Sequence, residues 1–441
     1  MGTVIAQVIV ENPLRSQLSV RSLCATFPST SGINREAVYL IAASFLINFG
    51  AGYFVVARPV YLYQIGFDPA IVGILITIQG LLGVALSIPA AMLSDVIGRK
   101  RFVVYGLLLD ALGSFLFFYS TDLALLIVAQ VVFAFVLAAA GAPFSALFTE
   151  TTTSENRNDL FVFLGFASGI ATSLGSFLSG LPPWLGNLLG TSEATAFRVL
   201  FLAVAVSSLA AGLVAQFFVS ERTTKRSGSS RISLRGAIKL PRKSLGVVKK
   251  FSIVSLTGMG AGMLIPLLPL WYNLRFGVDV SVIGPLYGSI FLMTAVASLF
   301  TPALARRKGS IFTIVVPDLA GVVVLLAMPY APGYLFAGVL MVVRSLLANM
   351  YNPIYESFMM GQIDPDERAT SASIIQMFDN VPRAYASGIG GYLFSLGLLD
   401  LPFFITAALY VLSDALLYAF FRKAGAGPSS NKDMVSPARA Q

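Results

Sequence analysis

The chain has 441 residues, of which 56% are hydrophobic and 12% are charged, and its formal net charge is +9. A soluble domain carries about 25% charged residues, so this composition excludes a water-soluble fold and predicts a polytopic membrane protein. With no histidine and one cysteine, Cys24, the chain cannot form an internal disulfide and offers almost no Cys/His metal ligands. We expect no nucleic-acid partner, because the positive charges are placed as topology signals.

Apolar segments long enough to cross a bilayer recur along the chain. A spanning helix needs about 20 mostly apolar residues, because the bilayer core is about 30 Å thick. Six segments are predicted in the first half, at 37–58, 71–93, 102–120, 123–148, 161–182 and 197–219. Six more are predicted in the second half, at 248–272, 281–305, 311–329, 332–359, 370–397 and 401–421. The expected fold class is an all-α membrane protein with twelve transmembrane helices.

Lysine and arginine gather in alternate connections between these segments. They lie at Arg99–Arg101, Arg157, Arg306–Lys308, Arg368 and Arg422–Lys423. Because Lys and Arg concentrate on the cytoplasmic side of a membrane, these connections and both termini are expected in the cytoplasm. We expect a multi-pass protein of the plasma membrane whose surroundings are the lipid bilayer.

The polar segments divide the chain into five parts. We expect a cytoplasmic tail over 1–35, a six-helix bundle over 36–220, a basic cytoplasmic linker over 221–249, a second six-helix bundle over 250–422 and a cytoplasmic tail over 423–441. The linker is either a solvated topology signal or carries a short amphipathic helix at 231–240 on the anionic inner leaflet.

A weak internal repeat relates the two halves. Pro143 and Pro353 are 210 positions apart, and Arg157 and Arg368 are 211 apart. Two similar halves of six helices in the same orientation are typical of the parallel two-half arrangement of secondary transporters.

The connection between the second and third segments carries a dense motif. Asp95 lies at a predicted helix end, where it can pair with nearby bases, and Gly98 permits a tight turn. The pattern resembles the loop signature of the major facilitator superfamily, with matches at Leu93, Asp95, Gly98, Arg99 and Lys100, and Arg101 continues the basic run. Ala91 and Val96 depart from it.

The resemblance to this superfamily covers about 36–422. It implies that the cluster latches the two halves in one state and releases them in the other; the alternative is a topology signal with a local ion pair. In the fifth segment, Gly175 and Gly180 are similar to the glycines of family antiporters, which implies export by antiport. Plain close packing of small residues is the other interpretation of these glycines.

Charged residues at membrane depth mark the candidate transport site, because such groups are costly and mostly functional. Arg344 lies in the tenth segment, and Asp379 and Arg383 lie in the eleventh at a spacing that puts them on one helix face. Asp379 is also the possible counter-charge of Arg344. These residues form either a substrate or proton site or a fixed ion-pair network.

Other candidates lie near the segment ends. Arg58 either gates the outer mouth or extends to the membrane interface. Glu150 and Glu356 either form an inner gate with Arg157 and Arg368 or cap solvated helix ends. Uncharged polar residues on the expected cavity-lining helices include Asn48, Tyr53 and Gln79.

The favoured function is alternating-access secondary transport, with proton-coupled export of amphipathic or lipophilic small molecules. The alternatives are a lipid or glycolipid flippase or a small-anion importer on the same fold, and a membrane receptor that transports nothing. Without histidine, a metal cluster or a Walker-type glycine loop in the sequence, we expect neither an enzyme nor an ATP-driven pump. No cofactor is expected besides the coupling ion H⁺, and the chain is expected to function as a monomer.

Overall fold

The computed structural model describes residues 34–153, 155–220, 243–298 and 310–422. Within these ranges every regular element is a helix. The expected tails over 1–33 and 423–441, the linker up to 242 and the basic cluster Arg306–Lys308 lie outside the described residues.

The first half is built from long helices and two short ones. They are α4 (Arg35–Gln64), α5 (Pro69–Ile97), α6 (Arg99–Tyr119), α7 (Leu123–Ala140), α8 (Ala142–Glu150), α9 (Arg157–Leu178), α10 (Pro182–Leu189) and α11 (Glu193–Phe218), of which α10 is a short extra helix between two longer ones. Aspartate side chains cap two of these helices: Asp68 accepts from the Ala70 amide and Asp122 from the amides of Ala124 and Leu125. The fourth predicted segment is interrupted at Gly141, which separates α7 from α8.

The second half is built from helices of the same kind. They are α13 (Leu245–Val254), α14 (Leu256–Leu264), α15 (Leu268–Phe276), α16 (Val280–Ser298), α18 (Ser310–Ala327), α19 (Tyr334–Gly361), α20 (Arg368–Ser395) and α21 (Leu401–Phe421). The seventh predicted segment is not one continuous helix. It is interrupted at Ser255, between α13 and α14, and at the 3-10 turn Ile265–Leu267, whose Pro266 lacks the amide hydrogen that an α-helix requires.

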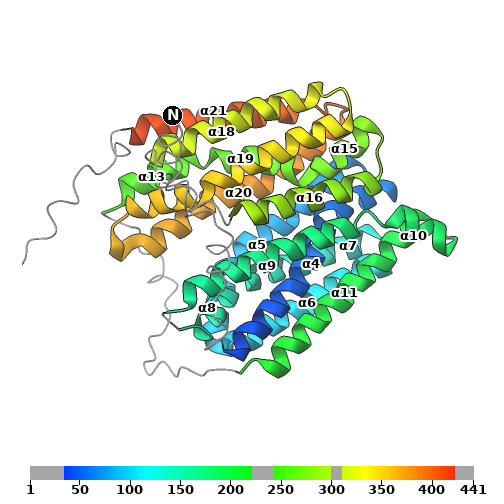
Figure 1. Cartoon of the computed structure of the whole chain (residues 1–441), viewed down its shortest axis with the longest axis horizontal. Helices are drawn as coiled ribbons and strands as arrows, with labels where there is room; N and C mark the ends of the chain where they lie inside the picture. Colours follow the sequence, from blue (N-terminus) through cyan, green and yellow to red (C-terminus); the bar gives the residue numbers. More distant parts are fainter. Residues whose placement is uncertain (1–33, 154, 221–242, 299–309, 423–441) are drawn as a thin grey trace, which may run out of the picture.

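The helices of each half pack mainly on one another (Figure 1). In the first half α4 packs on α9 and α11, while α7 packs on α5 and α6. In the second half α14 packs on α20 and α21, and α18 packs on α19 and α21. Two long helix pairs join the halves: α5 lies against α20, and α9 lies against α16.

Nine helical stretches within the described ranges are long and apolar enough to cross a membrane by length and composition. Val280–Val296 and Tyr334–Ala348 are shorter apolar helices. α20 covers the eleventh predicted segment but carries Asp379, Arg383 and other polar residues, which lower its hydropathy. Helices therefore lie over all twelve predicted ranges, and the number of membrane crossings stays a prediction.

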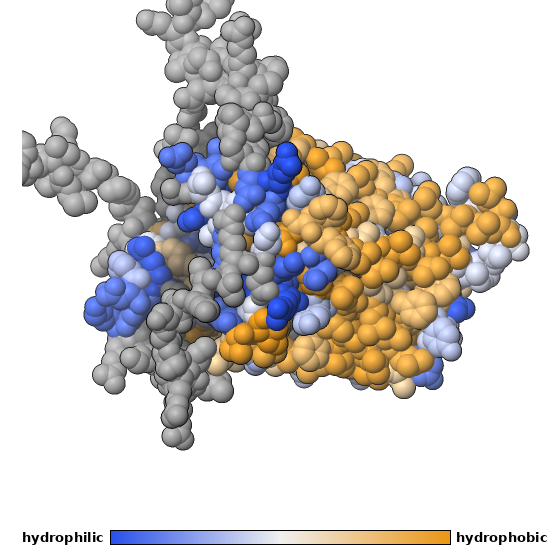
Figure 2. All heavy atoms as spheres, turned by 90° about the horizontal axis from the view of Figure 1, so that it is seen from below, coloured by the Kyte–Doolittle hydropathy of each residue, from blue (hydrophilic) through white to orange (hydrophobic). Residues whose placement is uncertain are grey.

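The polar residues separate toward one end of the bundle. On the face seen in Figure 2, hydrophobic side chains cover most of the described area and most hydrophilic ones gather at one end. We call this end, which holds α8 and α13, the basic end, and we call the end that holds α10 and α15 the opposite end (Figure 1). The loop around Arg99 also lies at the basic end, because Arg99 binds Glu150 at the end of α8. An apolar belt with a polar end is what a bilayer and its aqueous boundary demand.

Candidate functional site

The two halves touch most closely at the opposite end, where α5 crosses α20. A Cβ atom on Gly73 would lie 2.5 Å from the carbonyl oxygen of Ser387, and one on Gly80 would lie 2.6 Å from Cβ of Ala384. Between them, the Thr77 hydroxyl donates to the Ala384 carbonyl at 3.0 Å. Only glycine allows the two backbones to approach this far, so small residues create the contact.

The second crossing, of α9 with α16, has the same construction. A Cβ atom on Gly284 would lie 2.5 Å from the amide nitrogen of Gly180, and the Ser173 hydroxyl donates to the Gly288 carbonyl at 2.6 Å. The predicted packing residue Gly180 therefore lies at the contact between the halves. The predicted Gly175 lies elsewhere, where its Cα faces the Phe49 carbonyl of α4 within the first half.

Toward the basic end, α5 and α20 each carry an exposed segment. On α5 the consecutive residues Ser87–Pro89 are all exposed, with Ile88 at 50%, and on α20 the consecutive residues Gln376–Phe378 are all exposed. Their neighbours Ala90 and Ile375 are buried at 6% and 3% exposure, so each segment is exposed on one side and packed within its own half on the other. The close glycine contacts between α5 and α20 therefore lie toward the opposite end, and exposed residues of both helices lie toward the basic end.

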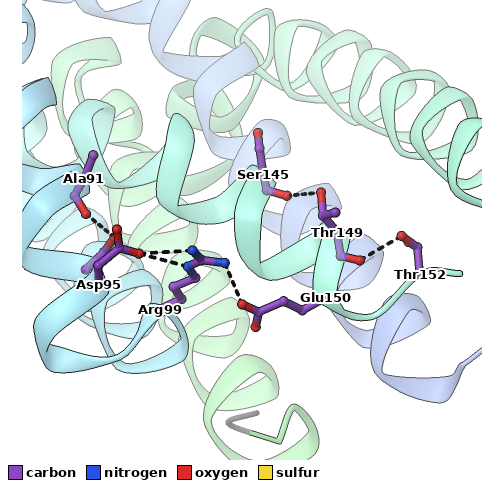
Figure 3. A network of polar contacts seen from close by, with 8 residues as sticks. Ala91, Asp95, Arg99, Ser145, Thr149, Glu150 and Thr152 are labelled. Carbon is purple, nitrogen blue, oxygen red and sulfur yellow. Dashed lines mark hydrogen bonds and ion pairs between the residues drawn. The ribbon is translucent and has the colours of Figure 1, made fainter. Parts of the chain in front are cut away.

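The motif loop forms an ion-pair network at the basic end (Figure 3). Arg99 donates through Nε and Nη2 to Oδ1 of Asp95 at 3.2 and 3.1 Å. Its Nη1 donates to Oε1 of Glu150, at the end of α8, at 2.6 Å. The network thus connects α5, α6 and α8, and all three helices belong to the first half.

The rest of the motif anchors the loop. Gly98 has a φ of 105°, a conformation that favours glycine. Nζ of Lys100 donates to the Gln216 carbonyl at 2.7 Å, near the C-terminal end of α11, where a cation is favourable. Arg101 is exposed, and Val96, which stands where the family pattern has arginine, is 75% exposed.

We expect Gly98→Ala to destabilise the protein by about 1–3 kcal/mol, because a residue with a Cβ is strained at this positive φ. Thermal unfolding of the detergent-purified chain measures the effect as a lower Tm. Gly246→Ala is the control, because Gly246 is helical and nothing lies within 4 Å of the position that its Cβ would take. The control should leave the Tm unchanged or raise it, and an equal loss in both variants would contradict the prediction.

Asp379 and Arg383 form the ion pair that their spacing predicts. Nη2 and Nε of Arg383 donate to Oδ2 of Asp379 at 2.8 and 3.1 Å. α14 comes close at this point, because Gly258 lies against Asp379 and Gly262 against the Arg383 backbone. The side chains remain 43% exposed for Arg383 and 26% exposed for Asp379, so the pair is partly accessible.

Arg344 does not use Asp379 as its counter-charge, and that prediction was wrong. Its side chain is 6% exposed, and Nη2 donates to the Tyr410 hydroxyl of α21 at 3.3 Å. The guanidinium carbon also lies 5.8 Å from the centre of the Tyr410 ring. The carboxylate of Asp379 is held by Arg383 on its own helix, so Arg344 turns toward α21 instead.

The two acid–base pairs expected at the inner gate are also absent from the described residues. Glu150 accepts from Arg99, while Arg157 donates to the Thr152 hydroxyl at 3.3 Å. Arg368 donates to the Met360 carbonyl at 3.1 Å, near the end of α19, and Glu356 is exposed. Both arginines bind local groups near helix ends, which sequence spacing does not distinguish from a long-range pair.

Arg58 lies inside the first half rather than extending to the membrane interface. Its Nη1 donates to Oε1 of Gln79 on α5 and to Oε1 of Gln130 on α7, the latter at 3.2 Å. Gln130 is completely buried. Three helices therefore contribute to one polar cluster, which we call the Arg58 cluster (Arg58, Gln79 and Gln130).

Two further predicted residues make contacts within the fold. The amide nitrogen of the Asn48 side chain donates to the Ser44 carbonyl one turn earlier at 2.8 Å. The Tyr53 hydroxyl is buried and donates to the Phe197 carbonyl at 3.0 Å. Both side chains therefore bind backbone carbonyls of the first half.

Polar residues of other helices supply partners whose pairing the sequence did not give. Gln130 and Tyr410 contact membrane-embedded arginines from positions 72 and 66 residues away. Asp110 accepts from the Ser208 hydroxyl at 2.6 Å and so joins α6 to α11. A polar side chain in a strongly apolar helix is the only sequence signal for such partners.

Known proteins share part of the sequence. The tetracycline resistance protein of class H from Pasteurella multocida is 24% identical over 298 residues, which cover 64% of this chain and 70% of that protein. The inner membrane transport protein YajR of Escherichia coli (strain K12) is 33% identical over 113 residues, which are 26% of this chain and 24% of that protein.

Solved transporter structures match nearly the whole chain. A mutant of the nucleoside transporter NupG matches with a TM-score of 0.73 and 14% identity over 87% of this chain and 99% of that one. A bacterial homologue of the lysosomal transporter Spinster, inward-facing and unoccupied, matches with a TM-score of 0.68 and 15% identity over 91% of this chain and 100% of that one. The family model of the Major Facilitator Superfamily matches residues 40–387. With its helical fold, apolar belt and two packed halves, the chain belongs to the Major Facilitator Superfamily of multi-pass membrane transporters.

Proposed function

We propose that this protein is a secondary active transporter that exports amphipathic small molecules in exchange for protons by alternating access. The observation that carries the proposal is the position of the contacts between the halves: the glycine crossing of α5 with α20 lies toward the opposite end, while Ser87–Pro89 of α5 and Gln376–Phe378 of α20 are exposed toward the basic end. We interpret this arrangement as a fold closed at one end and open at the other, which is one of the two states that alternating access requires.

In this proposal, residues 36–220 rock against residues 250–422 in a membrane crossed twelve times. The positive-inside rule places the basic end in the cytoplasm, so the observed state faces inward, and the plasma membrane is the expected location. The register of the α5–α20 crossing pairs Gly73 with Gly391 and Gly80 with Ala384. Continuing that register places Asp95 opposite the first turn of α20, where a carboxylate is favoured when the basic end closes.

Protons enter the proposal through the paired carboxylates. Protonation of Asp379 removes the negative charge that holds Arg383, and protonation of Glu150 removes one of the two partners of Arg99. Either event changes the relative energies of the two states, which is what a coupling ion must do. Drug export as the direction of transport is supported by the similarity to a tetracycline resistance protein.

We expect Asp379→Asn to reduce gradient-driven export at least tenfold, because the neutral side chain cannot gain or lose the coupling proton. The measurement uses proteoliposomes loaded with a labelled amphipathic compound, under an imposed pH gradient. Asp366→Asn is the matched control, because Asp366 lies 85% exposed in a turn at the basic end. The control should export at the wild-type rate.

The same experiment separates the alternatives. Export that is indifferent to the pH gradient contradicts proton coupling. Flux of a labelled glycolipid between leaflets, with none of soluble compounds, favours a flippase on this fold. Binding without flux of any compound favours a receptor.

A further inference from the structure

The Arg58 cluster has a free donor edge. The two amide oxygens of Gln79 and Gln130 both accept from Nη1 of Arg58. Nε of Arg58 is buried without a hydrogen-bond partner among the described residues, and so is the amide nitrogen of Gln130. A buried donor without a partner is costly, so the cluster has unsatisfied donors for which an anion is the complementary group.

The free edge is the one with which this protein binds carboxylates elsewhere. Arg99 uses Nε and Nη2 to bind Asp95, and Arg383 uses Nε and Nη2 to bind Asp379. In Arg58 the same pair of nitrogens makes no hydrogen bond to a described residue. Since a guanidinium binds a carboxylate or phosphate through two parallel donors, the two amides hold Arg58 with its anion-binding edge unoccupied.

No carboxylate of the described residues compensates the charge of Arg58. The ion pairs of these ranges involve other residues, at distances up to 3.9 Å. A cation at membrane depth without a counter-charge is rare, because it is paired in most proteins or marks a substrate path. The missing negative charge therefore points to a ligand.

Aromatic side chains lie one turn from the cluster on the same helix faces. Phe54 precedes Arg58 by one turn on α4, and Phe133 follows Gln130 by one turn on α7, and their ring centroids are 5.0 Å apart. α4 packs mainly on α9 and α11 whereas α7 packs on α5 and α6, so these rings and Arg58 bridge the space between α4 and α7. Phe133 is buried and Phe54 is partly exposed; an aromatic ring beside a cationic edge suits a molecule with one apolar and one anionic part.

We propose that the Arg58 cluster is a binding site for the carboxylate of an amphipathic organic acid. This rests on the proposed function insofar as the acid is a transported substrate. Arg58 supplies the bidentate contact through Nε and Nη2, Gln79 and Gln130 orient it, and the Gln130 amide nitrogen supplies a further donor.

The test compares three probes that share a naphthalene ring: naphthylacetate, naphthylacetamide and naphthylethylammonium. Their binding to the full chain in detergent is measured as the concentration dependence of the thermal shift. The wild type should bind the acetate at least tenfold tighter than the neutral amide, and the ammonium weakest. Arg58→Gln should abolish the preference, and Arg58→Lys should keep only part of it, because lysine lacks the two-donor edge.

Gln130→Glu keeps the test decisive if Arg58→Gln does not fold. It places a carboxylate of nearly the same shape beside Arg58, so the variant should be more thermostable than the wild type and should lose the preference for the acetate. Arg198→Gln is the matched control, because Arg198 donates to the carbonyls of Phe118 and Tyr119 at the end of α6. The control should retain the wild-type preference.

Equal binding of the three probes to the wild type would overturn the inference, as would an unchanged preference in both Arg58 variants. Acetate without the ring tests for a site that binds any small anion, and binding as tight as naphthylacetate would overturn the amphipathic part. Flux of the three probes is measured separately in proteoliposomes. Binding with the stated preference but no flux contradicts the proposed transport alone, and flux without the preference contradicts this inference alone.

Discussion

Gly73→Ala is expected to slow transport by about five- to 150-fold, because the observed closed crossing cannot hold the added methyl group. The new Cβ would lie 2.5 Å from the Ser387 carbonyl oxygen and 3.0 Å from Cα of Gly391. Both are backbone atoms of α20, so the helices must separate rather than rotate a side chain. Overpacking costs about 1–3 kcal/mol, and each 1.4 kcal/mol shifts the balance of two states by about tenfold. The initial rate of export from proteoliposomes measures the effect.

The control for this substitution is Gly165→Ala on α9. Gly165 is also helical, but nothing lies within 4 Å of the position that its Cβ would take, so the control should export at the wild-type rate and be at least as stable. Gly284→Ala, where Cβ would lie 2.5 Å from the Gly180 nitrogen, should behave like Gly73→Ala. Normal transport by both crossing variants would show that the glycine contacts are not a gate.

Arg99→Gln should impair transport more than either of its partners does when neutralised. Arg99 binds both Asp95 and Glu150. Without Arg99, these two carboxylates lie close together at the basic end. Asp95→Asn and Glu150→Gln each leave one pair intact. We expect a loss of about tenfold or more in export rate for Arg99→Gln, with thermal stability lowered by no more than about 1 kcal/mol because the network is partly exposed.

The double variant Asp95→Asn/Glu150→Gln tests whether the three residues act together. When both substitutions are added to Arg99→Gln, part of the lost export rate should return. The reason is that the two carboxylates, which repel each other without Arg99, have then been removed. Arg157→Gln is the control at the same end, because Arg157 donates to Thr152 and takes no part in the network. If Asp95→Asn folds normally and exports at the wild-type rate, the motif acts only as a topology signal.

The helical segments could be predicted because an apolar run of about 20 residues has few alternatives in a bilayer. The interruptions within them could not. Pro266 breaks the seventh segment and Gly141 the fourth, yet Pro59, Pro89 and Pro382 lie inside continuous helices. Whether a proline or glycine breaks a helix depends on how neighbouring helices satisfy the freed backbone groups, which a single sequence does not show.

Some contacts of the candidate site could be predicted from the sequence and others could not. The Asp379–Arg383 pair was predictable because both residues lie on one helix, where spacing alone brings them together. The pairing of Arg344 with Tyr410 and that of Arg58 with two glutamines was not, since these partners come from other helices. The resemblance to the superfamily signature identified the motif loop. The ion pair between Arg99 and Glu150 could not be predicted, because it depends on where α8 lies.

By itself the sequence determined that this is a helical membrane protein with two similar halves and a basic motif loop. The patterns of hydropathy and charge that determine these features lie in consecutive residues, so the sequence alone shows them. Only the tertiary structure decided that glycine crossings join the halves, that Arg58 has a free donor edge, and that Arg344 binds Tyr410. These depend on distances between helices, and such distances are set by close packing among side chains far apart in the chain.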